Sequence, residues 1–412
     1  MLKSKDRKIL RELALKVKDI ASDPINDKKI IEWKKHNSLK GNKPMIFVFP
    51  DVSWNELLPF SSLECENDIA KNIEYQLKKR IIRNKYIKDD VPIIADVEVQ
   101  KAITNTMWGV TPIFNRPKTP GGAFHHVSII ENSSDWSKLS QPIVTYNEAI
   151  SYENHNNILD AIGDIVPVNH VGIKNFSFHM LHWYCDYRGL DNLMTDLYDE
   201  PETVHKVIRF FTDGVKSMLK QYEEQNLISL NNDCTHHYTG GVGYTDELPK
   251  KEGFNANHIR LCDVWGAAEA QEFSSVSPKM HEEFILQYER ELLQPFGLNG
   301  YGCCDDLSKK LDGVLKIKNL RRVAACPWAD ISQFVPRLLK NYIITWKPQP
   351  SYLAFDKFDK SIVENELKNG LLKAKGGIIE LILRDTLTCR NQPERFSQWV
   401  DIARKAIEEV WV

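Results

Sequence analysis

Short, continuously apolar runs alternate with longer amphipathic segments along most of the chain. The clearest runs are residues 44–50, 91–97, 320–325, 342–346 and 377–383. Apolar runs of this length predict strands that are buried on both faces of a sheet. The segments between them place apolar residues three and four positions apart, which predicts amphipathic helices. This alternation of strands and helices predicts a parallel sheet covered by helices.

The number of predicted strands favours one parallel architecture over the other. Further strands are predicted at 172–178, 227–231, 258–264 and 296–299, which gives about nine candidates in 412 residues without an internal repeat. This count favours a (β/α)8 barrel over an open, doubly wound sheet. No predicted strand is followed by a G-x-G-x-x-G turn or a phosphate-binding Gly-Lys-Ser/Thr motif, so nucleotide binding loses its main support. We therefore expect residues 44–412 to form one barrel.

Two regions depart from the alternation. Residues 1–43 are predicted to form an N-terminal helical extension of two helices, the second of which follows Ser22-Asp23-Pro24. Within residues 105–145, the turn cluster Arg116–Gly122 and the β-rich piece His126–Ile130 predict a hairpin-like insertion.

Composition and charge exclude several classes of partner. The formal net charge is -2 and basic residues do not cluster in runs, so nucleic acid is not an expected partner. No stretch approaches the roughly 20 apolar residues that span a bilayer. The N-terminus lacks the apolar core of a signal peptide, so we expect a cytoplasmic protein whose eight cysteines are thiols. A homodimer is possible, since (β/α)8 barrels of this type often dimerise, but no sequence feature marks an interface.

Residues that follow the carboxyl ends of barrel strands line the active site. The predicted strands therefore select one set of polar, aromatic and thiol side chains, namely Asp96, Asp233, His236, His237, Asp263, Trp265, Glu269, Cys303, Cys304, Cys326, Trp346, Lys347, Arg384, Asp385 and Cys389. The segment Gly240-Gly-Val-Gly243 precedes no clear helix and lacks a lysine. We interpret it as a flexible active-site loop.

Cysteines are the strongest metal-ligand candidates at this predicted edge. Thiolate is a soft ligand that zinc prefers, and a catalytic zinc site needs about three protein ligands. We predict Cys304 as a ligand with Cys303 as the alternate, because the side chains of adjacent residues point apart. Cys389 is a further ligand, and His237 is the first candidate for the remaining position. The alternative for each cysteine is a small, buried apolar residue.

The other residues of the set are assigned to acid–base chemistry and substrate contact. We predict that the acid–base groups are Asp263, Asp233 and Glu269, and that the substrate contacts are His236, Trp265, Tyr301 and Trp346. His236 and Glu269 are also alternatives for the third metal ligand. Asp263 has a second interpretation as a cap of the following helix, and Asp233 as the partner of Arg260.

Three segments resemble a known superfamily. Arg188-Gly-Leu-Asp-Asn-Leu-Met-Thr-Asp-Leu-Tyr-Asp-Glu-Pro-Glu202 resembles a signature of the uroporphyrinogen decarboxylase superfamily. Ser277-Pro-Lys-Met-His-Glu-Glu-Phe284 is similar to a helix of that family, and Cys389 followed by Pro393-Glu-Arg-Phe396 is similar to its closing element. The order and spacing of these segments carry the resemblance over about residues 160–410.

This resemblance implies a (β/α)8 barrel with one of two chemistries. The decarboxylases carry an Arg-rich N-terminal motif, which this sequence lacks. The other branch resembles methylcobamide:coenzyme M methyltransferases and cobalamin-independent methionine synthase, in which zinc is bound by a His-x-Cys element and a later cysteine. Cys389 matches the later cysteine, whereas Tyr301 or Gly302 occupies the position of the histidine.

The resemblance thus implies a zinc-dependent methyltransferase that moves a methyl group between a small methylated substrate or thiol and a separate corrinoid protein. No corrinoid-binding module is evident in the chain, so cobalamin is expected only on that partner. The alternative enzyme is a metal-independent decarboxylase or lyase that uses Asp and His for acid–base chemistry. A third alternative is a barrel that binds a small molecule without turnover.

Overall fold

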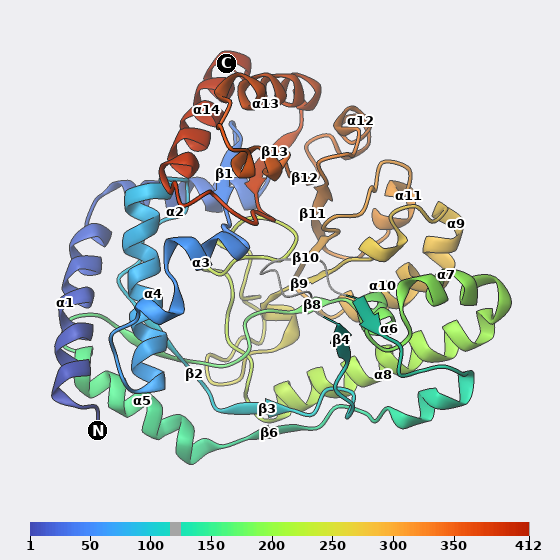
Figure 1. The fold of residues 1–412 in the computed structure, drawn as a ribbon, viewed down its shortest axis with the longest axis horizontal. Helices are drawn as coiled ribbons and strands as arrows, with labels where there is room; N and C mark the ends of the chain where they lie inside the picture. Colours follow the sequence, from blue (N-terminus) through green and yellow to red (C-terminus); the bar gives the residue numbers. More distant parts are fainter. Residues whose placement is uncertain (116–124, 412) are drawn as a thin grey trace.

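The computed structural model describes residues 1–115 and 125–411, and its centre is a seven-stranded parallel sheet (Figure 1). In spatial order its strands are β1 (Met45–Val48), β13 (Ile378–Leu383), β12 (Ile343–Trp346), β11 (Leu320–Ala325), β10 (Leu298–Tyr301), β9 (Trp265–Ala268) and β8 (Ser177–Phe178). Nearly all of their side chains are buried. The strands predicted within 44–50, 320–325, 342–346 and 377–383 are confirmed.

Two further strands, β2 (Val97–Gln100) and β7 (Val168–Val171), form a separate parallel pair. Within the described residues, strand pairing does not join this pair to the larger sheet or close that sheet into a barrel. Hydrogen bonds nevertheless extend from both edges of the seven strands. Asp90 N donates to Ile46 O (3.0 Å) at the β1 edge. Near the β8 edge, the Asn231 side-chain amide donates to Lys174 O (2.9 Å), which precedes β8, and to Trp265 O (3.1 Å) at the start of β9.

Five predicted strands differ from the structure. The run 172–178 keeps only β8 (Ser177–Phe178), and the run 296–299 is displaced to β10 (Leu298–Tyr301). Of the run 91–97, only Val97 belongs to a strand, because the carboxylates of Asp89 and Asp90 take the hydrogen-bonding positions beside β1. The run 227–231 contributes one bridging residue, Ile228. The run 258–264 precedes β9 and ends in a helical turn, Leu261–Asp263.

Helices surround the strands in Figure 1. The longer ones are α1 (Ser4–Ala21), α2 (Ile25–Asn37), α4 (Asp68–Ile82), α5 (Glu148–Ile162), α8 (Pro201–Glu224), α13 (Lys360–Ala374) and α14 (Glu394–Trp411). The shorter ones are α3 (Trp54–Leu57), α6 (Met180–Arg188), α7 (Leu190–Asp199), α9 (Pro278–His281), α10 (Gln287–Leu293), α11 (Leu311–Val314) and α12 (Val335–Leu338). None of the described helices combines the length and apolar character needed to cross a membrane.

The region predicted as an insertion contains two antiparallel pairs. β3 (Ile103–Asn105) pairs with β6 (Val144–Tyr146), and β4 (Ile113–Asn115) pairs with β5 (His125–Val127). The turn cluster predicted at 116–122 lies outside the described residues.

A buried ion pair lies within the parallel sheet, where α2 packs against it. The fully buried side chains of Arg322 on β11 and Glu380 on β13 approach to 3.7 Å. Thr345 Oγ1 donates to Glu380 Oε1 (2.5 Å), and Arg322 donates to Asn37 Oδ1 at the end of α2 (2.5 Å). Burial alone raises the pKa of Glu380, but the Arg322 charge, the neighbouring His36 and the Thr345 hydrogen bond lower it to about 2.

The glycine-rich segment 240–243 packs on this ion pair. A Cβ on Gly240 would lie 2.0 Å from Glu380 Oε1, and one on Gly241 would lie 2.4 Å from the ring of Trp33. The Gly241 amide also points to Glu380 Oε1 (3.3 Å). The prediction that this loop is flexible is therefore wrong, because these glycines allow the backbone to pack closely on buried side chains.

Replacing Arg322 should strongly destabilise the protein. In Arg322→Met the buried Glu380 carboxylate loses its arginine partner and keeps His36 Nε2 (3.6 Å) and the Thr345 hydroxyl as polar neighbours. This change should cost about 3–5 kcal/mol in the free energy of unfolding, measured in urea. Arg337→Met, which removes an exposed partner of Asp312, is the matched control and should cost at most about 1 kcal/mol. Equal effects of the two changes would contradict a structural role for the pair.

The low pKa of Glu380 also predicts a pH dependence. A lowered carboxyl pKa stabilises the fold above the ordinary value of 4.5, and this contribution is lost as the pH falls toward about 2. Between pH 4.5 and about 2, the free energy of unfolding of wild type should therefore fall more steeply than that of Arg322→Met, which already lacks this contribution.

Candidate active site

Two thiols lie directly after the carboxyl end of β10. Gly302 has φ +90° and turns the chain out of the strand. The amide of Cys303 then donates to the buried carboxylate of Asp305 (3.0 Å), which fixes the turn. The sulfur atoms of Cys303 and Cys304 lie 3.6 Å apart. Cys303 is buried and Cys304 is partly exposed, so the pair connects the protein interior to its surface.

Charged side chains from β12 and β13 meet these thiols because the carboxyl ends of parallel strands share one edge of the sheet. Lys347, directly after β12, donates from Nζ to Cys303 O (2.9 Å). Arg384, directly after β13, donates to Tyr238 O (2.9 Å) and stacks over the Tyr238 ring at 5.1 Å. Asp385 Oδ2 lies 3.7 Å from Cys304 Sγ.

These neighbours favour the thiolate form of Cys303. The Cys304 thiol donates a hydrogen bond to Cys303, and the charges of Lys347 and Arg384 add to its effect, so that the pKa of Cys303 falls well below 9.0 despite burial. The hydrogen bond between the two thiols has the opposite effect on Cys304, whose pKa it raises together with burial. The Tyr238 hydroxyl also hydrogen-bonds Cys303. These shifts favour a negative charge on the inner sulfur.

Two carboxyl groups at the same edge are prepared for proton transfer near neutral pH. Asp51 follows β1, and burial raises its pKa to about 6. Glu269 follows β9, and burial raises its pKa to about 7. His179, directly after β8, contacts Glu269 through Nδ1 at 2.6 Å. Groups with such pKa values can both give and take a proton at neutral pH.

The structure does not bring the four predicted metal ligands together. Cys389 Sγ donates to Glu56 Oε2 (3.1 Å), and burial and this carboxylate raise its pKa to about 12. The ring of His237 packs against Trp265 at 4.6 Å. Over the described ranges, no three or more His, Cys, Asp and Glu side chains are grouped so as to hold a metal ion. The arrangement does not fit the three-ligand zinc centre that the resemblance implies, and zinc binding stays a prediction.

Asp263 and Trp265 lie at the opposite end of the sheet from the thiols. β9 begins at Trp265, whereas the sequence predicted a strand that ended there. Asp263 accepts from Arg260 Nε (2.9 Å) and Lys250 N (3.1 Å), and Trp265 Nε1 donates to Gly243 O (3.0 Å). Their predicted position on the carboxyl edge is wrong, because Asp263 ends a helical turn that precedes the strand.

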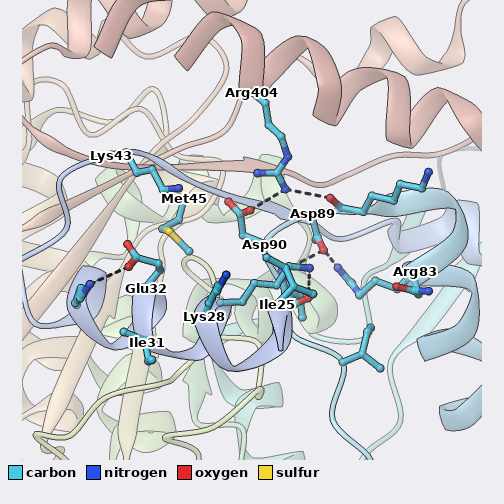
Figure 2. A pocket seen from close by; sticks show the side chains of 16 residues that line it. Ile25, Lys28, Ile31, Glu32, Lys43, Met45, Arg83, Asp89, Asp90 and Arg404 are labelled. Carbon is cyan, nitrogen blue, oxygen red and sulfur yellow. Dashed lines mark hydrogen bonds and ion pairs between the residues drawn. The ribbon is translucent and has the colours of Figure 1, made fainter. Parts of the chain in front are cut away.

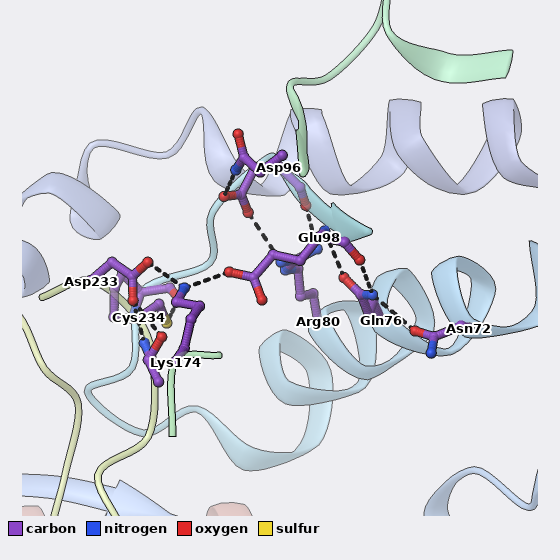
Figure 3. A network of polar contacts seen from close by, with 11 residues as sticks. Asn72, Gln76, Arg80, Asp96, Glu98, Lys174, Asp233 and Cys234 are labelled. Carbon is purple, nitrogen blue, oxygen red and sulfur yellow. Dashed lines mark hydrogen bonds and ion pairs between the residues drawn. The ribbon is translucent and has the colours of Figure 1, made fainter. Parts of the chain in front are cut away.

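Asp233 belongs to a separate polar network (Figure 3). Lys174 Nζ bridges Asp233 Oδ2 (2.6 Å) and Glu98 Oε1 (2.5 Å). The predicted pairing with Arg260 is wrong, because Arg260 pairs with Asp263.

Three predicted substrate contacts lie in packed surroundings. The ring of His236 stacks on Phe47 (4.9 Å) and Phe49 (4.6 Å). The hydroxyl of Tyr301 donates to Glu289 Oε2 on α10 (2.7 Å). The ring of Trp346 lies against α13, where a Cβ on Gly370 would approach it to 2.0 Å. These contacts place Tyr301 and Trp346 toward the helices and away from the thiols.

As predicted, one edge of the sheet brings together Cys303, Cys304, Lys347, Arg384 and Asp385, and Glu269 lies at the same edge. Asp51, His179 and Tyr238 were not among the predicted residues. Asp51 and His179 directly follow predicted strands, so the strand-end rule could have selected both. Tyr238 carries no such signal, because it lies in the loop that packs on the Arg322–Glu380 pair.

Comparison with solved structures gives a weak likeness. No protein-family model and no curated protein matches the sequence. The fold is similar to that of a solved methyltransferase from Methanosarcina mazei, with 8% identity over 93% of this chain and 99% of that chain and a TM-score of 0.48. We draw nothing about the reaction from a likeness at this level.

Removing the Lys347 charge should lower the reactivity of Cys303. Lys347→Met raises the pKa of Cys303, so its alkylation by iodoacetamide at neutral pH should slow by about tenfold. Tandem mass spectrometry separates Cys303 from Cys304. Lys309→Met, on the same loop but exposed, is the control. Unchanged alkylation in Lys347→Met would show that this lysine does not sustain the thiolate.

Proposed function

We propose that the chain is a methyl-transfer enzyme whose reaction centre is the Cys303 thiolate. The observation that carries the proposal is this buried sulfur, which has a lowered pKa and accepts hydrogen bonds from Cys304 and Tyr238. Thiolate is a strong nucleophile toward carbon, and methyl carbon is the least hindered electrophile it can meet. The superfamily resemblance of residues 160–410 also implies methyl transfer, although in that family the cysteines are zinc ligands.

The proposed architecture is a (β/α)8-type barrel. The seven parallel strands supply most of its wall, and the β2–β7 pair would supply the rest. Contacts support a connection on each side of the β2–β7 pair. On one side, the carboxylates of Asp89 and Asp90 accept hydrogen bonds from β1. On the other side, the Ile173–Ile228 bridge follows β7, and Asn231 bonds the start of β9. In such a barrel the carboxyl edge, with Cys303, is the expected place for catalysis.

The first proposed step is a displacement at the methyl carbon of a small donor. The Cys303 sulfur supplies the electron pair of the new S–CH3 bond. The bond between the methyl carbon and the donor heteroatom breaks, and the heteroatom keeps that electron pair. If the leaving heteroatom is basic, Asp51 or the His179–Glu269 pair can supply the proton it needs, since the pKa values of these carboxyls are about 6 and about 7.

The second step reverses the role of the sulfur. A nucleophile on the acceptor takes the methyl carbon, and Cys303 leaves as a thiolate. The features that lower the pKa of Cys303, the Cys304 hydrogen bond and the charges of Lys347 and Arg384, also make it a better leaving group.

We propose that a separate corrinoid protein exchanges the methyl group with this site. Exposed apolar side chains support a docking partner at this edge. Trp328, Phe355 and Leu387 lie in the segments after β11, β12 and β13, with exposed fractions of 61%, 44% and 62%. Large apolar side chains grouped around a site typically mark protein contacts.

Methylation of Cys303 tests the proposal directly. Incubation with free methylcobalamin, a minimal corrinoid methyl donor, should add one methyl group to Cys303, detected by peptide mass spectrometry. Cys303→Ser should take up no methyl, whereas Cys262→Ser, which removes a thiol outside the cluster, should react as wild type. Methyl uptake that persists in Cys303→Ser would overturn the proposed nucleophile.

A metal-independent lyase is the second candidate, and the His179–Glu269 contact specifically favours it. A protonated Glu269 with a pKa of about 7 could protonate a carbanion formed by loss of CO2.

This candidate predicts CO2 release from uroporphyrinogen in the presence of a chelator. The rate should fall as the pH rises above about 7, since Glu269 then loses its proton. Glu269→Gln should reduce the rate by about 100-fold, and Glu224→Gln on the surface should not. Absence of CO2 release from wild type would exclude this activity for uroporphyrinogen.

A further inference from the structure

A cavity of about 820 Å³ opens at the amino end of β1, away from the thiols at the carboxyl ends of the strands (Figure 2). α2 lines one side of it and Arg404 of α14 the other. Its volume lies within the range of about 300–1,000 Å³ that is usual for small-molecule sites. None of the residues discussed for the proposed reaction lines it.

The lining is strongly basic. Seven side chains are cationic, namely Lys28, Lys29, Lys35, Lys43, Arg83, Lys88 and Arg404, and three are acidic, namely Glu32, Asp89 and Asp90. Each acid is already neutralised by one cation of the same cavity. Arg83 pairs with Asp89, Arg404 with Asp90 (2.8 Å) and Lys35 with Glu32 (2.9 Å).

The other four lysines of the lining form no ion pair with a described residue, although the charges of Asp89 and Asp90 partly offset that of Lys29. Lys28, Lys43 and Lys88 form no ion pair or side-chain hydrogen bond with any residue in the ranges 1–115 and 125–411. Lys29 Nζ donates only to Val91 O (3.2 Å), and burial lowers its pKa. Like charges around one cavity repel, so a bound anion would relieve their repulsion.

The cavity also has an apolar wall. Met45, Val91 and Ile93 are buried side chains that reach its surface, and Ile25 and Ile31 expose 47% and 50% of their surface. An inorganic anion would leave this wall in contact with water. A ligand with an apolar body and an anionic head would cover the wall and meet the lysines.

We propose that this cavity binds an organic phosphate, an amphipathic phosphomonoester with an apolar body. Its phosphate oxygens would lie among Lys28, Lys29, Lys43 and Lys88, and its apolar part on Met45, Val91 and Ile93. The pairs Arg83–Asp89 and Arg404–Asp90 hold the walls in place. This site is independent of the proposed methyl transfer.

Calorimetry with n-octyl phosphate, below its micelle concentration, tests the proposal on the full chain. Wild type should bind one equivalent and should bind inorganic phosphate at least about tenfold more weakly, because the apolar contacts are then absent. The double variant Lys43→Glu/Lys88→Glu should bind octyl phosphate at least about tenfold more weakly than wild type. The control Lys8→Glu/Lys16→Glu changes two exposed lysines of α1, outside the cavity, by the same charge and should bind as wild type.

Vesicles containing phosphatidic acid distinguish the source of the ligand. Binding of soluble octyl phosphate alone supports a soluble phosphomonoester, and competition between octyl phosphate and vesicles supports a lipid headgroup in the same cavity. The proposal is overturned if wild type shows no saturable binding of octyl phosphate, if vesicles bind but octyl phosphate does not, or if the cavity and control variants bind it equally. Circular dichroism of each variant confirms that it is folded.

Discussion

The buried pair of Arg322 and Glu380 is the interaction on which the centre of the molecule depends. Two charges enclosed within a sheet are costly unless each has partners, and here the partners come from separate parts of the chain. Asn37 from α2 meets Arg322, Thr345 from β12 meets Glu380, and Gly240 brings its backbone against the carboxylate. The pair therefore joins the N-terminal helices and the 233–245 loop to three strands of the sheet.

The same loop carries this constraint to the candidate active site. Tyr238 is two residues from Gly240, accepts a hydrogen bond from Arg384 at its carbonyl and donates from its hydroxyl to Cys303. Tyr238 is thus positioned beside Cys303 by the backbone at Gly240, which packs on the Arg322–Glu380 pair. Lys347 and Arg384 come directly from strands of the sheet, so the charges around Cys303 are fixed by the most buried part of the fold.

The sequence predicts the fold better than it predicts the site. The runs at 320–325, 342–346 and 377–383 are continuously apolar and form strands, and the strand-end rule then correctly places Lys347 and Arg384 near Cys303. It fails at residues 258–264, where the contact between Arg260 and Asp263 closes a helical turn before β9 and Asp263 lies at the opposite end of the sheet. Cys389 illustrates a further limit, because nothing in local sequence shows that its thiol meets Glu56, 333 positions away. Long-range contacts of this kind decide which candidates share a site.

The central claim is that Cys303 is a thiolate in the folded protein at neutral pH. The most direct measurement is the 13Cβ chemical shift of Cys303 across pH, in protein labelled at cysteine and assigned by comparison with Cys303→Ser. The account predicts the shift of a thiolate at neutral pH, with protonation only on acidification. A shift that stays that of a thiol through neutral pH and titrates near or above the ordinary value of 9.0 would contradict it.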